Sequence, residues 1–160
     1  MSPDSAGPRR REHIQMTPTE VAGFLDNPLT MVLATHGAAG FPHQVAMFYV
    51  MDGGNPVFWS YRGAQKIVNI GRDPRVSCLV EDGADYRNLR GVLLGGHARV
   101  AFDPAVIERT ARLLSEKYTG PVTPADLANF RRQADKRCVV TVEVERVTSW
   151  DHRKLPPGRH

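Results

Sequence analysis

Cysteine is scarce in this sequence, and the two that occur lack the spacing of a metal or redox site. Cys78 and Cys138 each stand in an apolar, strand-like run, without a CxxC pair or a Cys/His cluster. A disulfide between them is one interpretation, but in a chain without an export signal isolated cysteines are usually buried thiols. The histidines are also scattered, with no HExxH motif. We therefore expect no metal site and no disulfide framework.

Long hydrophobic runs are absent as well. No apolar stretch approaches the ~20 residues that a membrane-spanning helix needs. The run Arg9-Arg10-Arg11 is followed by no hydrophobic segment, which argues against a secretory or twin-arginine signal. The sequence therefore predicts a cytoplasmic protein without a membrane partner.

Most of the chain has no large excess of positive or negative charge. The formal net charge is +4, but much of the excess lies within residues 1–13 and 151–160. The body between them is close to neutral, which argues against nucleic acid as the main ligand, although a basic rim would still attract a small polyanion. The length of 160 residues predicts one domain. We expect a disordered tail over 1–15, a folded domain over 16–155 and a short tail over 156–160.

The common nucleotide and nucleophile motifs do not occur. The sequence contains neither GxGxxG nor GxxxxGK[ST], so it supports neither a Rossmann dinucleotide site nor a P-loop. Ser60 is not part of a GxSxG elbow and is not proposed as a nucleophile. No residue is assigned a catalytic role from the sequence.

What the chain does contain is a succession of short strands joined by tight turns. Asp52-Gly53-Gly54-Asn55 has the composition of a hairpin turn, and Gly95-Gly96 marks a bulge in a long strand. Thr17-Pro18-Thr19-Glu20 is a capping box that opens a helix. We expect strands over residues 30–36, 42–51, 56–61, 75–81, 90–102 and 137–147, and helices from Thr17, near Gly63, over 104–118 and from Thr123. This pattern favours a mainly β (α+β) fold, an antiparallel barrel with peripheral helices, over a parallel sheet.

The third strand runs through Gly63 into a helix start, and polar or cationic side chains gather at this junction. They are Ser60, Arg62, Lys66 and Asn69. A helix N-terminus offers unpaired N–H groups and partial positive charge, which suit a phosphate. Lys66 would point back over the first turn, and Arg62 adds a guanidinium fork. The alternative interpretation is a junction with solvated charges.

Several segments resemble, in order and spacing, the split β-barrel of the pyridoxamine 5′-phosphate oxidase-like flavin and deazaflavin proteins. The matching pieces are Val32-Leu33-Ala34-Thr35, Gly40-Phe41-Pro42-His43, Val45-Ala46-Met47-Phe48-Tyr49-Val50, Phe58-Trp59-Ser60-Tyr61 with Lys66 and Asn69, Arg72-Asp73-Pro74-Arg75-Val76-Ser77, and Gly96-His97-Ala98-Arg99-Val100. The tail Ser149-Trp150-Asp151-His152-Arg153-Lys154-Leu155 resembles the actinobacterial branch that uses coenzyme F420, a deazaflavin hydride carrier. The resemblance implies a six- to seven-stranded antiparallel split barrel of the FMN-binding type.

The resemblance also implies where a cofactor would bind. The phosphate candidates are Ser60, Arg62 and Lys66, with Asn69 as a supporting contact. The candidates for lining the ring are Gln44, Val45, Ala46 and Met47. Trp59 and Tyr61 are further candidates, although Trp59 alternates with Val57 as a core residue would. Because the family's sites lie at a homodimer interface, Trp150 and His152 are expected from the neighbouring subunit.

Three functions follow from this resemblance. The first is an F420-dependent reductase that transfers hydride from the deazaflavin to a small organic acceptor. The second is an FMN-binding oxidase or flavin reductase on the same fold. The third is a non-catalytic protein that carries a cofactor or a tetrapyrrole. The F420 tail is acidic and suits the basic edges of the chain, and the conceivable acceptors include quinones, biliverdin-like tetrapyrroles and unsaturated lactones.

Overall fold

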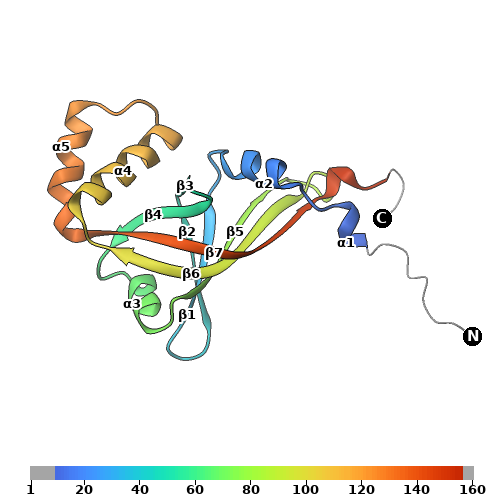
Figure 1. Ribbon diagram of the computed structural model, residues 1–160, viewed down its shortest axis with the longest axis horizontal. Helices are drawn as coiled ribbons and strands as arrows, with labels where there is room; N and C mark the ends of the chain where they lie inside the picture. The colour runs from blue at the N-terminus through green and yellow to red at the C-terminus, as the bar shows by residue number, and fades with distance from the viewer. Residues whose placement is uncertain (1–9, 157–160) are drawn as a thin grey trace, which may run out of the picture.

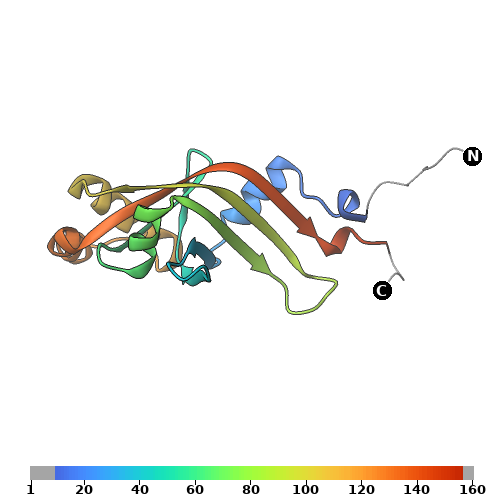
Figure 2. The same cartoon turned by 90° about the horizontal axis from the view of Figure 1, so that it is seen from below.

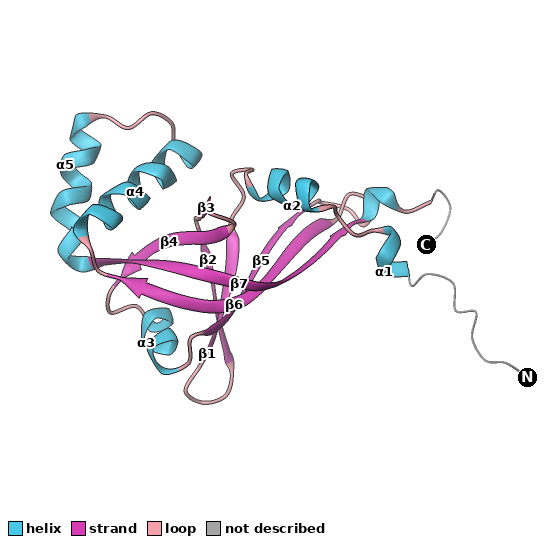
Figure 3. Cartoon of the chain, in the orientation of Figure 1, coloured by secondary structure: helices cyan, strands magenta, loops and turns pink. Residues whose placement is uncertain are grey.

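A computed structural model describes residues 10–156 of the chain, which fold into one antiparallel sheet with helices around it (Figures 1 and 3). The strands are β1 (Met31–His36), β2 (Pro42–Met47), β3 (Val50–Asp52), β4 (Asn55–Tyr61), β5 (Arg75–Asp82), β6 (Arg90–Ala101) and β7 (Arg137–Asp151). The helices are α1 (Arg10–His13), α2 (Pro18–Leu25), α3 (Gln65–Arg72), α4 (Pro104–Tyr118) and α5 (Pro124–Gln133), with 3-10 turns η1 (Ala134–Lys136) and η2 (His152–Lys154). The sheet order is β2-β1-β5-β6-β7-β4-β3. The predicted antiparallel barrel with peripheral helices is confirmed, as is the irregularity at Gly95/Gly96.

The expected single strand over 42–51 is divided between the two edges of the sheet. β2 pairs with β1 at one edge, and β3 pairs with β4 at the other. Between them, the backbone of Tyr49 bonds to a side chain: its N–H donates to the Tyr118 hydroxyl at 3.2 Å, and its carbonyl lies 3.0 Å from the same oxygen. At Tyr49, the Tyr118 hydroxyl of α4 therefore bonds to the backbone N–H and carbonyl that a neighbouring strand would otherwise pair with. Because the chain passes directly from one edge to the other here, the sheet curves into a barrel.

The inner face of the barrel carries the main core, and only part of its outer face is covered. The inner core includes Leu33, Phe58, Cys78 and Val140. A second cluster joins the outer face of β4 and β7 to α4 and contains Val57, Val139, Ile107 and Leu114. Seen from below, α3, α4 and α5 gather at one end of the long sheet, and α1 lies with η2 at the other (Figure 2). The helices thus leave part of the outer face open.

The start of α2 gives a direct stability prediction. Thr17 accepts a hydrogen bond from the Glu20 N–H at 3.2 Å, and the Glu20 carboxylate accepts one from the Thr17 N–H at 2.7 Å. Replacing Thr17 by alanine removes one half of this capping box, so we expect the free energy of unfolding to fall by about 1 kcal/mol. Urea unfolding would measure the change. Thr19→Ala, in the exposed first turn of the same helix, is the matched control, and an equal loss in both variants would contradict the capping assignment.

The chain before Met16 contains a short helix and bonds to the rest of the fold. Arg10–His13 forms a turn of helix, and the Ile14 carbonyl accepts a hydrogen bond from the Asp151 N–H at 2.7 Å. The Met16 N–H donates to the Ser149 hydroxyl at 3.0 Å. Residues 14–16 therefore contact the end of β7, and the expected domain bounds stay a prediction. Residues 1–9 and 157–160 of the expected tails lie outside the described residues.

Within residues 10–156, no helix is long and apolar enough to cross a membrane. Both cysteines are free and buried, as expected, and burial raises the pKa of the Cys78 thiol to about 12.

Candidate functional site

Strand β4 divides the predicted cofactor contacts between the two faces of the barrel. Ser60 lies on the inner face and is only 3% exposed. Trp59 and Tyr61 lie on the outer face, because side chains alternate along a strand. There the Arg137 guanidinium stacks on both rings, 4.3 Å from the centroid of Trp59 and 3.6 Å from that of Tyr61. Trp59 also meets the Phe130 ring of α5 edge-on, so its role in this chain includes packing.

The N-terminus of α3 follows closely after the C-terminal end of β4. Its N-cap residue is Ala64, whose side chain cannot cap the helix. The hydroxyl of Ser60 is buried and has no hydrogen-bond partner among the described residues. Buried hydroxyls are almost always paired in native proteins. A buried, unpaired hydroxyl beside an uncapped helix start is therefore a place where a ligand group would fit.

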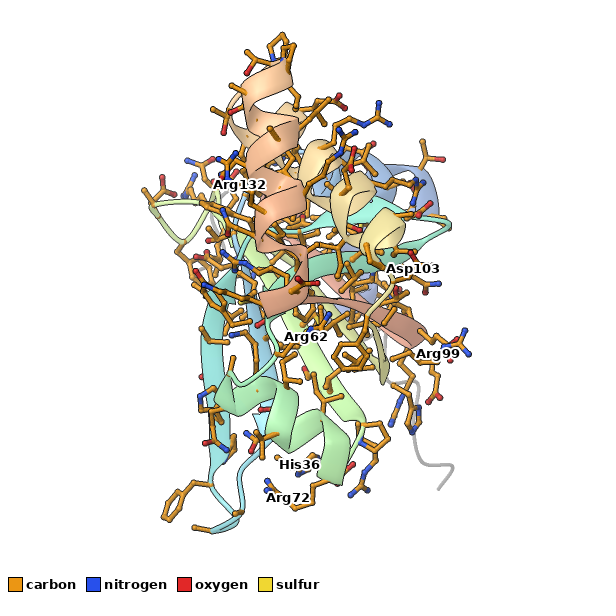
Figure 4. The ribbon with its side chains drawn as sticks, turned by 90° about the vertical axis from the view of Figure 1, so that its left-hand side faces the viewer. His36, Arg62, Arg72, Arg99, Asp103 and Arg132 are labelled. Atoms are coloured by element: carbon orange, nitrogen blue, oxygen red, sulfur yellow. The ribbon has the colours of Figure 1, made fainter. Side chains whose placement is uncertain are left out.

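Three cations surround this junction from β4, α3 and β7, and one of them, Arg137, lies on the outer face of the barrel. They are Arg62, Lys66 and Arg137, and each of them lowers the pKa of the Cys138 thiol, although burial outweighs them and leaves that pKa raised. The Arg62 Nε donates to the Arg137 carbonyl at 2.8 Å, and its guanidinium lies 5.0 Å from the centroid of the Phe102 ring. Figure 4 shows Arg62 between α3 and the junction of α5 with β7. We call Ser60, Arg62, Lys66 and Arg137 the cation seat.

The cation seat lacks negative charge of its own. In the described part of the chain, none of its three cations forms an ion pair with a carboxylate. Burial lowers the pKa of Lys66, because partial removal from water disfavours the charged ammonium. Such a cluster can bind an anion that restores the missing charge. Arg137 is not among the cofactor contacts that the sequence predicts. Only the pairing of Arg137 with Tyr61 across β4 and β7 reveals its place.

Asn69 supports the seat from inside the fold. Its side chain is fully buried, and its amide nitrogen donates to the Thr35 hydroxyl at 3.0 Å. Its amide oxygen accepts from Gln65 Nε2 at 2.9 Å and from Arg72 at 3.0 Å. Arg72 also donates to the His36 carbonyl at 2.7 Å, beside the end of α3 (Figure 4). These bonds fasten α3 to β1, so Asn69 positions the helix that carries Lys66.

The four ring-lining candidates on β2 are also divided. Val45 and Met47 pack against the inner core, whereas Gln44 and Ala46 are exposed on the outer face. Trp150, the tail candidate on β7, shares that outer face, because the register continues from Ala46 through Val32, Leu79, Leu93 and Thr148. The open outer face therefore unites Gln44, Ala46 and Trp150.

Three cavities follow one another along this open face. One of about 260 Å³ is lined by residues that include Ala34, Pro42 and Ser77. It shares Ser77 with a cavity of about 350 Å³ over Gly95 and Gly96. That cavity shares Leu93 and Thr148 with one of about 520 Å³ at the end of β7, which Trp150 and His152 line. We call this series the outer trough; volumes of this size suit small ligands.

His152 is held in one orientation at the end of the trough. Its Nδ1 lies 2.8 Å from the Tyr86 carbonyl, and its ring centroid lies 4.6 Å from that of Tyr86. A carbonyl only accepts hydrogen bonds, so Nδ1 carries the hydrogen and Nε2 is the second, variable nitrogen. In the part of the chain that the structure describes, no group of three or more His, Cys, Asp or Glu side chains could hold a metal ion.

Residues 17–151 match the profile of the family described as pyridoxamine 5′-phosphate oxidase. The chain belongs to this family. The family includes oxidoreductases, and its split-barrel fold agrees with the sheet order given above.

Solved structures agree with the family assignment. A conserved hypothetical protein of Mycobacterium tuberculosis is 38% identical with a TM-score of 0.86, over 96% of this chain and 97% of that one. A structure described as an F420 reductase is 28% identical with a TM-score of 0.60, over 78% of this chain and 93% of that one. A protein of Mesorhizobium loti described as FAD-binding shares the fold at 18% identity and a TM-score of 0.65, over 84% of this chain and 94% of that one. Among proteins of curated function, none matches the sequence.

Proposed function

We propose that this protein is an F420-dependent oxidoreductase that reduces a small organic acceptor. The observation that carries the proposal is the cation seat: an unpaired buried hydroxyl and three cations without a carboxylate partner, beside an uncapped helix start. This donor set fits the phosphodiester of a deazaflavin. When bound, F420 supplies a hydride at its ring carbon.

The residues of the chain bind and orient this cofactor. Lys66 and Arg62 would neutralise the phosphate, and the Ser60 hydroxyl would donate a hydrogen bond to it. On the outer face of β2, the exposed side chains of Ala46 and Gln44 would hold the ring, Ala46 by apolar contact and the Gln44 amide by hydrogen bonds to the pyrimidine oxygens. A fixed ring on an apolar surface orients the hydride and excludes water from it.

F420 is favoured over FMN because the positive charge extends beyond the needs of one phosphate. Arg137 is a third cation of the seat, and Arg132 and Lys136, both exposed, precede it on α5 and η1. FMN carries no anionic group beyond its phosphate, whereas F420 continues into an acidic oligoglutamate tail. The likeness to a solved F420 reductase supports the same choice.

The site is proposed to be completed in a homodimer that works in the cytoplasm. The cation seat lies near α3 at one end of the sheet, whereas Trp150 and His152 lie at the other end with α1 (Figure 2). A two-fold arrangement with the open outer faces together would bring the β7 end of each chain to the seat of its partner. Sedimentation velocity should then give a mass near twice 17.8 kDa, and a monomer at micromolar concentration would contradict the dimer.

Parallel calorimetric titrations of cofactor-free protein with F420 and with FMN test the proposal. We expect F420 to bind with a Kd in the micromolar range or below, roughly −8 kcal/mol or stronger, and FMN at least tenfold more weakly. Reduced F420 with a panel of acceptors would then test turnover. The reverse preference would move the protein to the FMN oxidases and flavin reductases, and binding without turnover would make it a cofactor carrier. If neither cofactor binds, the seat has another ligand.

A further inference from the structure

Arg62 bonds to the C-terminal end of α5 from outside that helix. Its Nε donates to the Arg137 carbonyl at 2.8 Å, and its Nη2 donates to the Ala134 carbonyl at 3.4 Å. The Arg62 backbone N–H adds a third bond, to the Lys136 carbonyl at 3.1 Å. Ala134 is the C-cap residue of α5 and the first residue of η1. Because the last carbonyls of a helix lack intrahelical partners and carry partial negative charge, a guanidinium placed there stabilises the helix end.

The Arg62 guanidinium keeps donors that these carbonyls do not use. Arginine has five N–H donors, and the bonds to Arg137 and Ala134 occupy one on Nε and one on Nη2. These two lie on the same edge of the guanidinium plane, so the edge that ends in Nη1 is left over. In the part of the chain that the structure describes, Arg62 forms no ion pair with a carboxylate. An anion can therefore bind the second edge while the first edge keeps its carbonyls.

The position of Arg62 brings the cation seat and α5 together. Arg62 follows the buried, unpaired hydroxyl of Ser60 by two residues and precedes the uncapped N-terminus of α3. Figure 4 shows it between α3 and the junction of α5 with β7. An anion at the start of α3 and the carbonyls at the end of α5 would thus share one guanidinium.

The end of α5 also holds the aromatic side chains on the outer face of β4. Phe130 of α5 meets the Trp59 ring edge-on, with 5.9 Å between the ring centroids. Arg137 stacks on the rings of Trp59 and Tyr61. It also donates to the Gln133 side chain of α5 at 2.9 Å. A change in the order of this helix end would therefore reach the outer face of β4.

We propose that Arg62 couples anion binding at the cation seat to the order of α5 and η1. Without an anion, the exposed Arg62 side chain has only neutral carbonyls as hydrogen-bond acceptors among the described residues. An anion on its second edge fixes the guanidinium, and the fixed guanidinium holds the Ala134 and Arg137 carbonyls. Ordering a long side chain costs conformational entropy, and the two sets of contacts share that cost. The inference rests on the proposed function for the identity of the anion, the phosphate of the cofactor.

Hydrogen exchange, followed by mass spectrometry, measures the order of residues 130–137 in the cofactor-free protein. Inorganic phosphate is the first probe, because it can reach the seat without a ring, and F420 is the second. At saturation, we expect each probe to slow exchange over residues 130–137 by about fivefold, the effect of one additional hydrogen bond. Sodium chloride at equal ionic strength should leave this exchange unchanged, and peptides of α2 should not respond to either probe.

Arg62→Lys separates the charge of this residue from its planar fork. Lysine keeps the positive charge but cannot bond along two edges, so we expect calorimetry to show F420 binding weakened by less than about tenfold. At saturating F420, the slowing over residues 130–137 should be lost. Arg62→Ala should lose both binding strength and slowing. Arg112→Ala, which removes an exposed cation from α4, is the matched control and should keep both. Circular dichroism and the thermal midpoint show whether each variant folds, and Arg62→Lys suffices if Arg62→Ala does not.

The outcomes separate this coupling from the proposed function. Full slowing in Arg62→Lys, or an equal loss in Arg112→Ala, would overturn the role of Arg62. Normal F420 binding with unchanged or faster exchange over residues 130–137 would overturn the coupling and leave the proposed function standing. Slower exchange with phosphate but no binding of F420 would overturn the proposed function and leave the coupling between the seat and α5. Binding of neither probe would overturn both.

Discussion

Replacing Lys66 by alanine is expected to weaken F420 binding by roughly 10- to 100-fold while the protein stays folded. Lys66 has no ion-pair partner among the described residues, and it lies in the first turn of α3, close enough to Cys138 to lower the pKa of that thiol. A charge-assisted hydrogen bond to a ligand contributes about 1.5–3 kcal/mol, which corresponds to this loss of affinity.

Stability should not fall in parallel, and the direction of the Lys66 pKa shift explains why. Burial lowers the pKa of Lys66 in the folded protein, so the unfolded chain binds the proton more tightly. Stability from this group is therefore lowest below the folded pKa and rises as the pH increases through the folded pKa toward the unfolded value. Removing the charge removes this penalty at neutral pH. Lys66→Met, which keeps the aliphatic stem, should unfold at the same urea midpoint as the parent protein or a higher one.

Calorimetry with F420 and urea unfolding measure the two effects separately. Arg112→Ala is the matched control, because it removes one positive charge from the exposed surface of α4. F420 affinity should also fall as the pH rises through the lowered Lys66 pKa, and this decrease should be absent in Lys66→Met. Unchanged affinity in a folded Lys66 variant would remove this lysine from the cation seat.

The sequence was a better guide to the strands than to the faces they present. Turn chemistry at Asp52–Asn55, the capping box at Thr17 and the helix start at Thr123 are local signals, so they placed elements correctly. The break at Tyr49 is not local, because it depends on Tyr118, 69 residues further along the chain. No pattern within residues 42–51 signals that a helix will supply the hydrogen bonds.

In the candidate site too, local patterns were informative and features that depend on distant parts of the chain were not. Strand alternation indicates that Trp59 and Tyr61 share one face and Ser60 the other, but it does not indicate which face meets a ligand. That choice depends on α4 and α5, which cover the outer face of β4 and leave that of β5 open. Arg137 could not be assigned from the sequence for a similar reason, since its neighbours on β4 are distant along the chain.

Asn69→Ala is expected to lower the free energy of unfolding by about 3 kcal/mol, since it removes three hydrogen bonds from a fully buried side chain. A supporting cofactor contact, as the sequence predicts for Asn69, would behave differently. Its loss would reduce F420 affinity with little change in stability. The structure gives Asn69 a positioning role, so we expect the stability loss to dominate and any loss of affinity to follow from movement of α3.

Gln65→Ala separates these two roles. It removes one bond to the same Asn69 oxygen, but from an exposed side chain in the first turn of α3. We expect it to change stability by less than about 1 kcal/mol and to leave F420 affinity within about threefold, because the Thr35 bond still anchors the helix. Urea unfolding and calorimetry on both variants make the comparison. If Asn69→Ala kept its full stability and bound F420 at least tenfold more weakly, the amide would contact the cofactor directly, and α3 would be held by its apolar face through Ile67 and Ile70.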